Sequence, residues 1–275
     1  MTRFAIEVAL LWTAVGLYIG ATALYAYALI FNHPERVRFG TLAAVAGLVA
    51  HSASLIQRWV AVGHGPYMLK YEVLSSNAWI LVVMALLFTR NRVKWAPLMV
   101  LALPAAFLMM GLGLFTSPEA RDLPPSLRSM WLVFHVFFNK LAVGAFVLSG
   151  GAAIASLRKT AGKAGRLLDR LPDAPVLDAY VVRFVGFGFI FWTVTIVAGS
   201  IWANQSWGRY WGWDPIETWS LVTWLCYGSL LHVRLFFHLR PRATAFGTLS
   251  CFGISVLTVF IFPFLIPSMH SAYFQ

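Results

Sequence analysis

Long apolar runs alternate with short polar segments along the whole chain. Eight of these runs reach or approach the roughly 20 residues that a helix needs to cross a bilayer. The pattern therefore predicts an all-α fold, a polytopic membrane helix bundle of about eight transmembrane helices in a single domain over residues 1–275. The predicted spans are residues 5–31, 39–61, 76–89, 96–115, 131–156, 184–203, 218–238 and 244–267, of which the third is the shortest.

The composition agrees with a membrane protein. Hydrophobic residues make up 60% of the chain and charged residues 11%, whereas a soluble domain carries about 25% charge. The first run is too long for the core of a signal peptide and lacks a small-residue cleavage pattern behind it, so it predicts a span. Cys226 and Cys251 fall inside apolar runs and are interpreted as packing residues.

The basic residues indicate an orientation rather than nucleic-acid binding. The net charge is +11, and in alternate loops we count twelve Lys and Arg on one side and five on the other. The richer side is expected in the cytoplasm, which places both termini and the loops near 62–75, 116–130 and 204–217 outside. The long basic loop at 158–183 would then be a cytoplasmic anchor of the topology.

Tryptophan is concentrated in one outer segment. Six of the 12 tryptophans lie within residues 202–225, WANQSWGRYWGWDPIETWSLVTWL. Aromatic residues gather at membrane interfaces, but this tendency explains neither the number nor the two acidic residues. A broad aromatic shelf at an interface would suit a large planar ligand. Its expected surface residues are Trp207, Tyr210, Trp211 and Trp213.

The same segment carries the signals of a helix start. Asp214 is a good N-cap, Pro215 suits the first helical position, and Glu217 stands where a capping box places its acid. Gly208 and Gly212 interrupt any continuous helix before that point. For the two acids, capping alone is the alternative to a functional role.

Two histidines stand at the outer edges of spans. His135 begins the fifth span and His270 follows the eighth, on the same side as the aromatic segment. Two neutral imidazoles on opposite faces of a macrocycle are a common way to hold haem iron, so this pair is a candidate for axial ligands.

Other histidines lie within spans or near loops. His232 and His51 fall inside spans, where an ionisable group indicates either function or a neutral histidine bonded to a neighbouring helix. The remaining charges near spans are Arg58, Glu72 and Lys140, which could pair with each other or with a ligand. Surface positions are expected for His33, His64 and His238.

The segment WANQSWGRYWGWDPIETWSL resembles the signature of the tryptophan-rich, or WWD, family of haem-handling cytochrome c assembly proteins. Its Trp-Asp-Pro-x-Glu-Thr-Trp form is similar to the CcsA (ResC) branch of System II, and the CcmC branch usually departs from it and has six spans. Further likenesses are LLHVR around His232, MHSAY at His270 and FHVFFNKLAVGAF around His135. The resemblance covers most of the chain from about His51 onward, with the WWD segment at about 202–220 between spans six and seven.

The resemblance implies a role in cytochrome c biogenesis. Haem b would be bound and presented at the outer membrane face for covalent attachment to the CxxCH thiols of apocytochrome c. The chain would be a subunit of a cytochrome c synthase, or haem lyase, complex and would supply no catalytic nucleophile. A haem exporter or chaperone of the CcmC type, without synthase activity, is the alternative, and an unrelated transporter of a hydrophobic ligand is a third reading.

The resemblance also implies site residues and partners. His135 and His270 would ligate the iron of external haem, and His232 would ligate haem at an inner site together with a histidine of a CcsB (ResB)-like membrane protein. Thiol-reducing proteins and membrane lipid are further expected partners. The expected location is the bacterial inner membrane, with a thylakoid membrane as the other setting. The WWD surface would comprise Trp207, Gly208, Trp211, Trp213 and Asp214.

Overall fold

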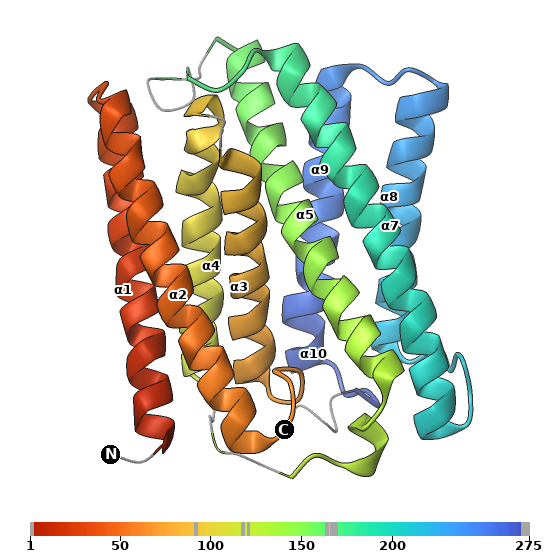
Figure 1. The fold of residues 1–275 in the computed structure, drawn as a ribbon. Coiled ribbons are helices and arrows are strands. Elements are labelled where there is room, and N and C mark those ends of the chain that lie inside the picture. Colours follow the sequence, from red (N-terminus) through yellow and green to blue (C-terminus); the bar gives the residue numbers. More distant parts are fainter. Residues whose placement is uncertain are drawn as a thin grey trace. The chain divides into compact units, whose positions relative to one another are not determined.

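The computed structural model describes residues 3–90, 93–116, 119, 122–162, 165 and 170–270. All regular secondary structure within these residues is helical (Figure 1). The chain divides into two compact units. Unit 1 comprises residues 1–122 and 158–173, and unit 2 comprises residues 123–157 and 174–275. The prediction of an all-α polytopic bundle is confirmed, and the single domain over 1–275 stays a prediction.

Unit 1 is built from four long helices. Helix α1 packs against α2 and α4, and α3 packs against α2 and α4. Gly47 allows the closest approach of α1 to α2, because a Cβ there would lie 2.7 Å from the ring of Tyr18. The elements are α1 (Arg3–Ile30), η1 (Pro34–Arg36), α2 (Val37–Val62), α3 (Lys70–Thr89), η2 (Val93–Leu98) and α4 (Met99–Leu114).

The third span is longer than the sequence predicted. We expected it at 76–89, but α3 begins at Lys70 and has 20 residues. The sequence suggested a later start because Lys70 and Glu72 are charged and charged residues usually lie outside a span. In the structure, however, Glu72 is buried. Its carboxylate accepts hydrogen bonds from the backbone N–H groups of Met68 and Leu69, which satisfies donors that a helix start leaves free.

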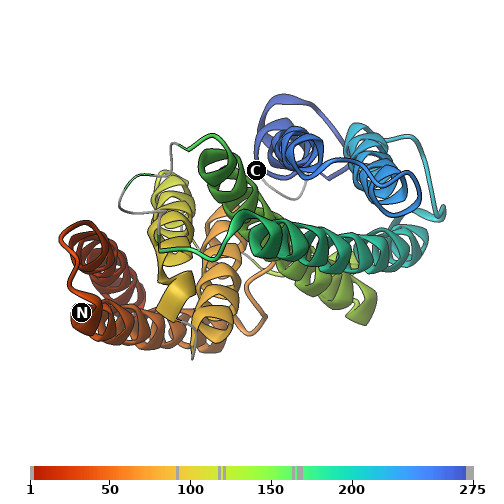
Figure 2. The same cartoon turned by 90° about the horizontal axis from the view of Figure 1, so that it is seen from above.

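Unit 2 also contains four long helices, seen from above in Figure 2. Helix α7 packs against α8 and α9, and α8 packs against α9. Within this unit the start of α5, the end of α7 and the start of α8 lie at the lower end in Figure 1. The elements are η3 (Pro125–Leu127), α5 (Met130–Thr160), α7 (Ala174–Trp207), α8 (Pro215–Phe236), α9 (Pro241–Val256), the π-helical turn η4 (Leu257–Ile261) and α10 (Phe262–Leu265).

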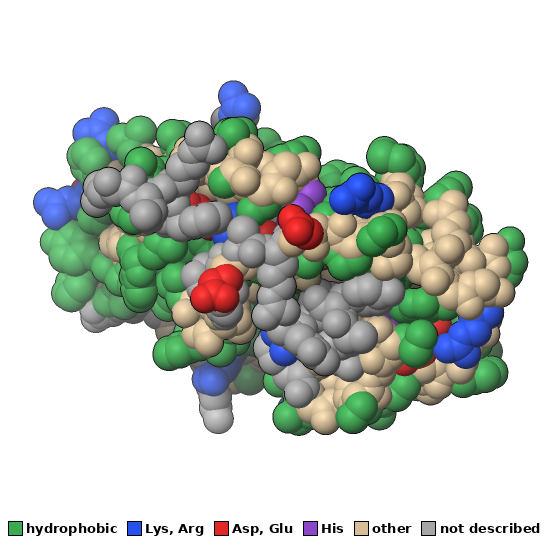
Figure 3. Space-filling model, turned by 90° about the horizontal axis from the view of Figure 1, so that it is seen from below, with side chains coloured by type: hydrophobic (Ala, Val, Ile, Leu, Met, Phe, Trp, Pro, Cys, Tyr) green, Lys and Arg blue, Asp and Glu red, His purple; other side chains and the backbone are tan. Residues whose placement is uncertain are grey.

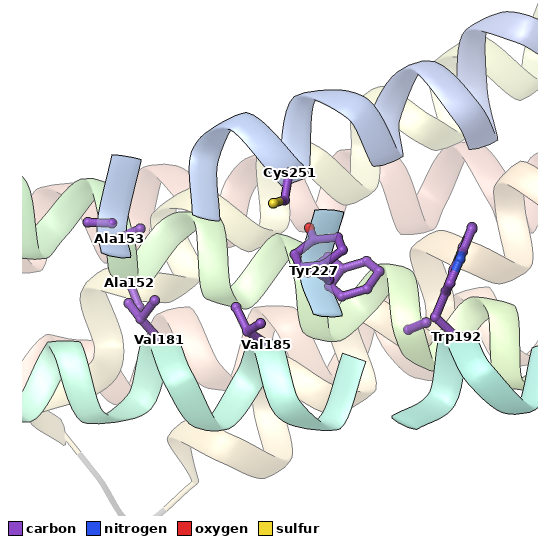
Figure 4. Close-up of a cluster of buried hydrophobic side chains, with 10 residues drawn as sticks. Ala152, Ala153, Val181, Val185, Trp192, Tyr227 and Cys251 are labelled. Carbon is purple, nitrogen blue, oxygen red and sulfur yellow. The ribbon is translucent and has the colours of Figure 1, made fainter. Parts of the chain in front are cut away.

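The core of unit 2 combines small apolar side chains with the aromatic rings of Phe146, Trp192 and Tyr227 (Figure 4). Phe146 of α5 and Tyr227 of α8 stack with ring centroids 3.9 Å apart and an interplanar angle of 4°. Trp192 of α7 is buried beside Phe146 and donates its indole N–H to the carbonyl of Ser220 at 3.0 Å. The large apolar area that these rings bury holds α5, α7 and α8 together.

Seven helices of the described residues are long and apolar enough to cross a membrane. The other predicted span corresponds to α8, which has 22 residues and more polar positions. The sixth span, expected at 184–203, is instead the 34-residue α7. This helix absorbs part of the predicted basic loop, because Asp178 is buried in it and pairs with Arg234 of α8. The chain is an integral membrane protein.

Candidate functional site

The tryptophan-rich segment is a short connection between α7 and α8. Helix α7 ends at Trp207, and Gly208 follows with a φ of +74°, a left-handed conformation that glycine adopts without strain. Helix α8 starts at Pro215 after the N-cap Asp214. Glu217 completes the capping box by accepting the N–H of Asp214 at 3.2 Å and that of Gly212 at 2.8 Å. The predicted helix break and helix start are therefore confirmed.

His135 lies against the backbone of α7. Its Nδ1 is 2.8 Å from the carbonyl oxygen of Thr195. A Cβ at Gly199 would lie 2.5 Å from the same Nδ1, so only glycine leaves room for the imidazole there. Trp202 stacks on the ring with centroids 6.4 Å apart and an interplanar angle of 26°. Thr195, Gly199 and Trp202, on one face of α7, thus hold the imidazole of His135 in place.

His270 is held by the N-cap of α8. Its Nδ1 lies 3.1 Å from Oδ2 of Asp214. The other oxygen of this carboxylate accepts the backbone N–H of Met269 at 2.8 Å. The imidazole also contacts Trp207 and Trp202, with centroid distances of 5.2 and 5.8 Å. Asp214 therefore positions His270 in addition to starting the helix.

The hydrogen bonds determine which ring nitrogen is available on each histidine. A carbonyl oxygen and a carboxylate oxygen only accept hydrogen bonds, so a neutral His135 and a neutral His270 both carry the proton on Nδ1. Each then has its lone pair on Nε2. An imidazole that donates its other N–H to a carbonyl or a carboxylate is the usual arrangement of a metal-ligating histidine. Each side chain therefore presents the kind of donor atom that an axial ligand of haem iron needs.

Trp202 connects the two histidines. Both imidazoles are in ring contact with it, and it is itself buried, with its indole N–H donated to the carbonyl of Ser126 at 2.9 Å. Trp202 belongs to the tryptophan-rich segment but was not predicted as a site residue. Thr195 and Gly199 were not predicted either, because one acts through its backbone carbonyl and the other through the absence of a side chain, and neither feature gives a sequence motif.

Two rings of the aromatic shelf are exposed, and Trp211 is half-buried. Trp213 is 69% exposed and Tyr210 is 60% exposed. Trp211 meets Trp213 edge-on, with centroids 5.9 Å apart. Figure 3 views the molecule from the end at which α8 begins, and the charged side chains visible there are scattered rather than gathered in one patch. The exposed aromatic rings give this surface an apolar character that suits a flat hydrophobic ligand.

The carboxyl group of Asp214 is tuned by its surroundings. Burial raises its pKa, but hydrogen bonds from His270 and from the N–H of Met269 outweigh that effect and hold the pKa below the usual range. Asp214 is therefore ionised at neutral pH, which favours the Nδ1–H tautomer of His270. Within the described residues, no group of three or more His, Cys, Asp or Glu side chains could hold a metal ion.

Three other histidines of the sequence analysis lie elsewhere in their units. His232 is exposed near the end of α8 and contacts the rings of Phe236 and Phe237, at 4.9 and 5.7 Å. It is 17 residues beyond Pro215, or about 25 Å along the helix at 1.5 Å per residue. It is therefore not part of the His135 and His270 site.

His51 and His64 belong to unit 1. His51 is buried, with Nδ1 3.3 Å from the hydroxyl of Tyr18 and Nε2 2.9 Å from the hydroxyl of Ser75, which favours the interpretation as a neutral histidine bonded to neighbouring helices. The expected surface position of His64 is wrong. This residue is buried because its ring packs against Tyr67 and its Nδ1 meets the carbonyl of Gly65 at 2.8 Å.

Comparison with known proteins places this chain in a family. Residues 40–270 match the family described as cytochrome C assembly protein. The cytochrome c biogenesis protein CcsA of a Synechococcus species is 33% identical, over 89% of this chain and 93% of its own length. The protein of the same name from Gloeobacter violaceus is 30% identical, over 97% of this chain and 96% of its own length.

A solved structure supports the fold independently. The cytochrome c haem lyase CcmF aligns with all of this chain at a TM-score of 0.73 and 15% sequence identity. The chain spans about half of that protein, since the alignment covers 49% of it. The relatives named CcsA confirm the predicted resemblance to that branch, and the chain belongs to the cytochrome c assembly protein family.

Proposed function

We propose that unit 2 binds haem b through His135 and His270 and presents it at the extracytoplasmic face for attachment to apocytochrome c. A role in cytochrome c maturation follows from membership of the family. The observation that carries the finer proposal is the shared contact of both imidazoles with Trp202, with Nδ1 of each ring engaged by the protein. Two Nε2 lone pairs are the donor set that bis-histidine haem requires.

In this proposal haem is a substrate, and the apocytochrome brings the nucleophiles. Each cysteine S–H adds across a vinyl C=C of haem, so that a C–S bond forms and the hydrogen goes to the neighbouring carbon. The chain supplies no nucleophile. Its contribution is to hold the macrocycle so that the vinyl edge meets the thiols, and orientation of this kind can supply about 7–11 kcal/mol of the barrier reduction.

The surroundings of the histidines suit this task. Trp207 contacts the imidazole of His270, and Trp211 and Trp213 pack edge-on against each other in the same connection. Gly208 and Asp214 set the backbone at its two ends. An aromatic surface at the membrane interface would take up the macrocycle as it leaves the bilayer. The exposed end of α8 around His232 would face a CcsB-like partner, which would contribute the second ligand of an inner haem.

Absorption spectra of the protein purified with its CcsB-like partner test the ligand assignment. We expect a six-coordinate haem spectrum that is lost or altered in His135→Ala and His270→Ala and restored by added imidazole in the corresponding glycine variants. His33→Ala is the matched control, since that side chain is 41% exposed on the turn between α1 and α2. Wild-type spectra in both site variants would contradict the proposal.

A second experiment separates synthase from chaperone. Co-production with an apocytochrome should give a haem-stained product that survives denaturation, and the product should be absent when both CxxCH cysteines are replaced by alanine. Haem bound by the chain without any covalent product, in the presence of the partner, would favour the exporter or chaperone of the CcmC type.

A further inference from the structure

Unit 1 holds a buried group of charged side chains that the proposed function does not use. Glu7 of α1, Arg58 of α2 and Glu72 of α3 are all at most 2% exposed. They lie at the start of α1, the end of α2 and the start of α3. Charged side chains at this depth in a membrane protein are costly and need close compensation.

Glu72 is fully compensated as a carboxylate. Its Oε1 accepts the Nε–H of Arg58 at 2.9 Å, and its Oε2 accepts the backbone N–H groups of Met68 and Leu69 at 3.1 and 3.2 Å. These three donors stabilise its charge and cap α3. The charge of Arg58 is matched by this contact, and its guanidinium also lies 5.6 Å from the ring centroid of Tyr71.

Glu7 is compensated much less well. Its Oε2 is 3.6 Å from Nη1 of Arg58, beyond hydrogen-bond distance. Its Oε1 is buried and has no hydrogen-bond partner among the described residues, and the same holds for the neighbouring hydroxyl of Tyr71. An ionised Glu7 would therefore be a second carboxylate beside one guanidinium.

A proton on Glu7 would remove the second negative charge beside Arg58. We propose that Glu7 is a proton-binding site, with its carboxyl group neutral in the resting protein and Oε1–H directed to the hydroxyl oxygen of Tyr71. The proton removes the excess negative charge, and Oε1 is paired with Tyr71 in the same step. A buried carboxylate that lacks a close cationic partner is costlier than the neutral acid, so the neutral form is favoured.

The other groups around Glu7 agree with this assignment. Among the described side chains, the titratable and charged groups that act on it are Arg58 from α2 and Tyr71 and Glu72 from α3. Helix α4 also packs against α1 and carries no titratable side chain. Burial and Glu72 oppose an ionised Glu7, whereas the Tyr71 hydroxyl and Arg58 favour it. Glu72 already occupies the guanidinium Nε, which weakens the contribution of Arg58.

Infrared difference spectroscopy of the purified full-length protein at neutral pH tests the proposal. We expect Glu7→Gln to remove a C=O band of a protonated carboxylic acid. The control Glu35→Gln, at a side chain that is 62% exposed, should remove carboxylate bands only. Loss of carboxylate bands in Glu7→Gln would overturn the proposal.

Two further measurements distinguish the loss of a bound proton from a folding defect. Glu7→Gln should unfold at the temperature of the wild type, because it replaces one neutral group with another of the same shape, and a drop of several degrees would show that an ionised Glu7 is needed. Tyr71→Phe should shift the acid band to higher frequency by removing its acceptor. An unshifted band would overturn the pairing with Tyr71.

Discussion

Asp214 and His270, 56 positions apart in the sequence, are joined by a hydrogen bond of 3.1 Å between Oδ2 and Nδ1. The same carboxylate caps α8 by accepting the N–H of Ile216 at 3.1 Å and holds the following chain through the N–H of Met269 at 2.8 Å. A single side chain thus links the start of α8 to the segment after α10. The orientation of His270 depends on that link.

Asp214→Asn tests this link. The variant keeps the shape of the side chain but loses the charge that accepts three hydrogen bonds, so we expect a loss of about 2 kcal/mol in the free energy of unfolding. Haem affinity should fall by about 10- to 100-fold, because the carboxylate also orients the imidazole. Thermal unfolding and haem titration measure the two effects. Asp173→Asn, at an exposed position, is the control, and equal affinities in the two variants would contradict the prediction.

The contribution of Asp214 should depend on pH. Burial alone would raise its pKa, but the hydrogen bonds from His270 and Met269 lower it below the usual value. A group with a lowered pKa in the folded state stabilises the protein above its unfolded-state pKa and loses that contribution as the pH falls. We therefore expect the difference in unfolding temperature between wild type and Asp214→Asn to be full at pH 7 and to shrink below about pH 4. A constant difference over this range would argue against the assignment.

Gly199→Ala should disturb His135 specifically. The new Cβ would lie 2.5 Å from Nδ1, so the imidazole has to leave its contact with the carbonyl of Thr195. We expect an altered haem spectrum and a loss of about 1–3 kcal/mol in stability from overpacking. The control is Gly186→Ala on the same helix, where a Cβ meets nothing within 4 Å. That variant should keep the wild-type spectrum, and identical spectra for both variants would show that His135 is not seated as described.

Arg58→Met should be among the most damaging changes in unit 1. It leaves the buried Glu72 carboxylate without its partner, and breaking a buried pair in this way costs about 3–5 kcal/mol. Arg36→Met is the matched control, since its pair with Glu35 is exposed and worth about 0–1 kcal/mol. Chemical denaturation of both variants in the same detergent compares them. Equal losses would mean that the burial of Arg58 is not maintained in the membrane-extracted protein.

The helices were predictable because their signals are local. Apolar runs of span length marked most of them, and Asp214, Pro215 and Glu217 marked the start of α8 within four residues of sequence. The early start of α3 and of α7 was missed for the opposite reason. Glu72 and Asp178 are charged residues, and a sequence does not reveal that Arg58 and Arg234 will neutralise them in the interior.

By itself, the sequence determined the membrane fold, the aromatic segment and the two histidines at the edges of spans, since each depends on composition or on neighbouring residues. Only the tertiary structure decided how these parts are used. It brought His135 and His270 to Trp202, assigned the Nδ1 protons through Thr195 and Asp214, and left Nε2 with its lone pair on both rings. Such contacts join residues that lie far apart in the chain, and the packing of α5, α7 and α8 sets their distances.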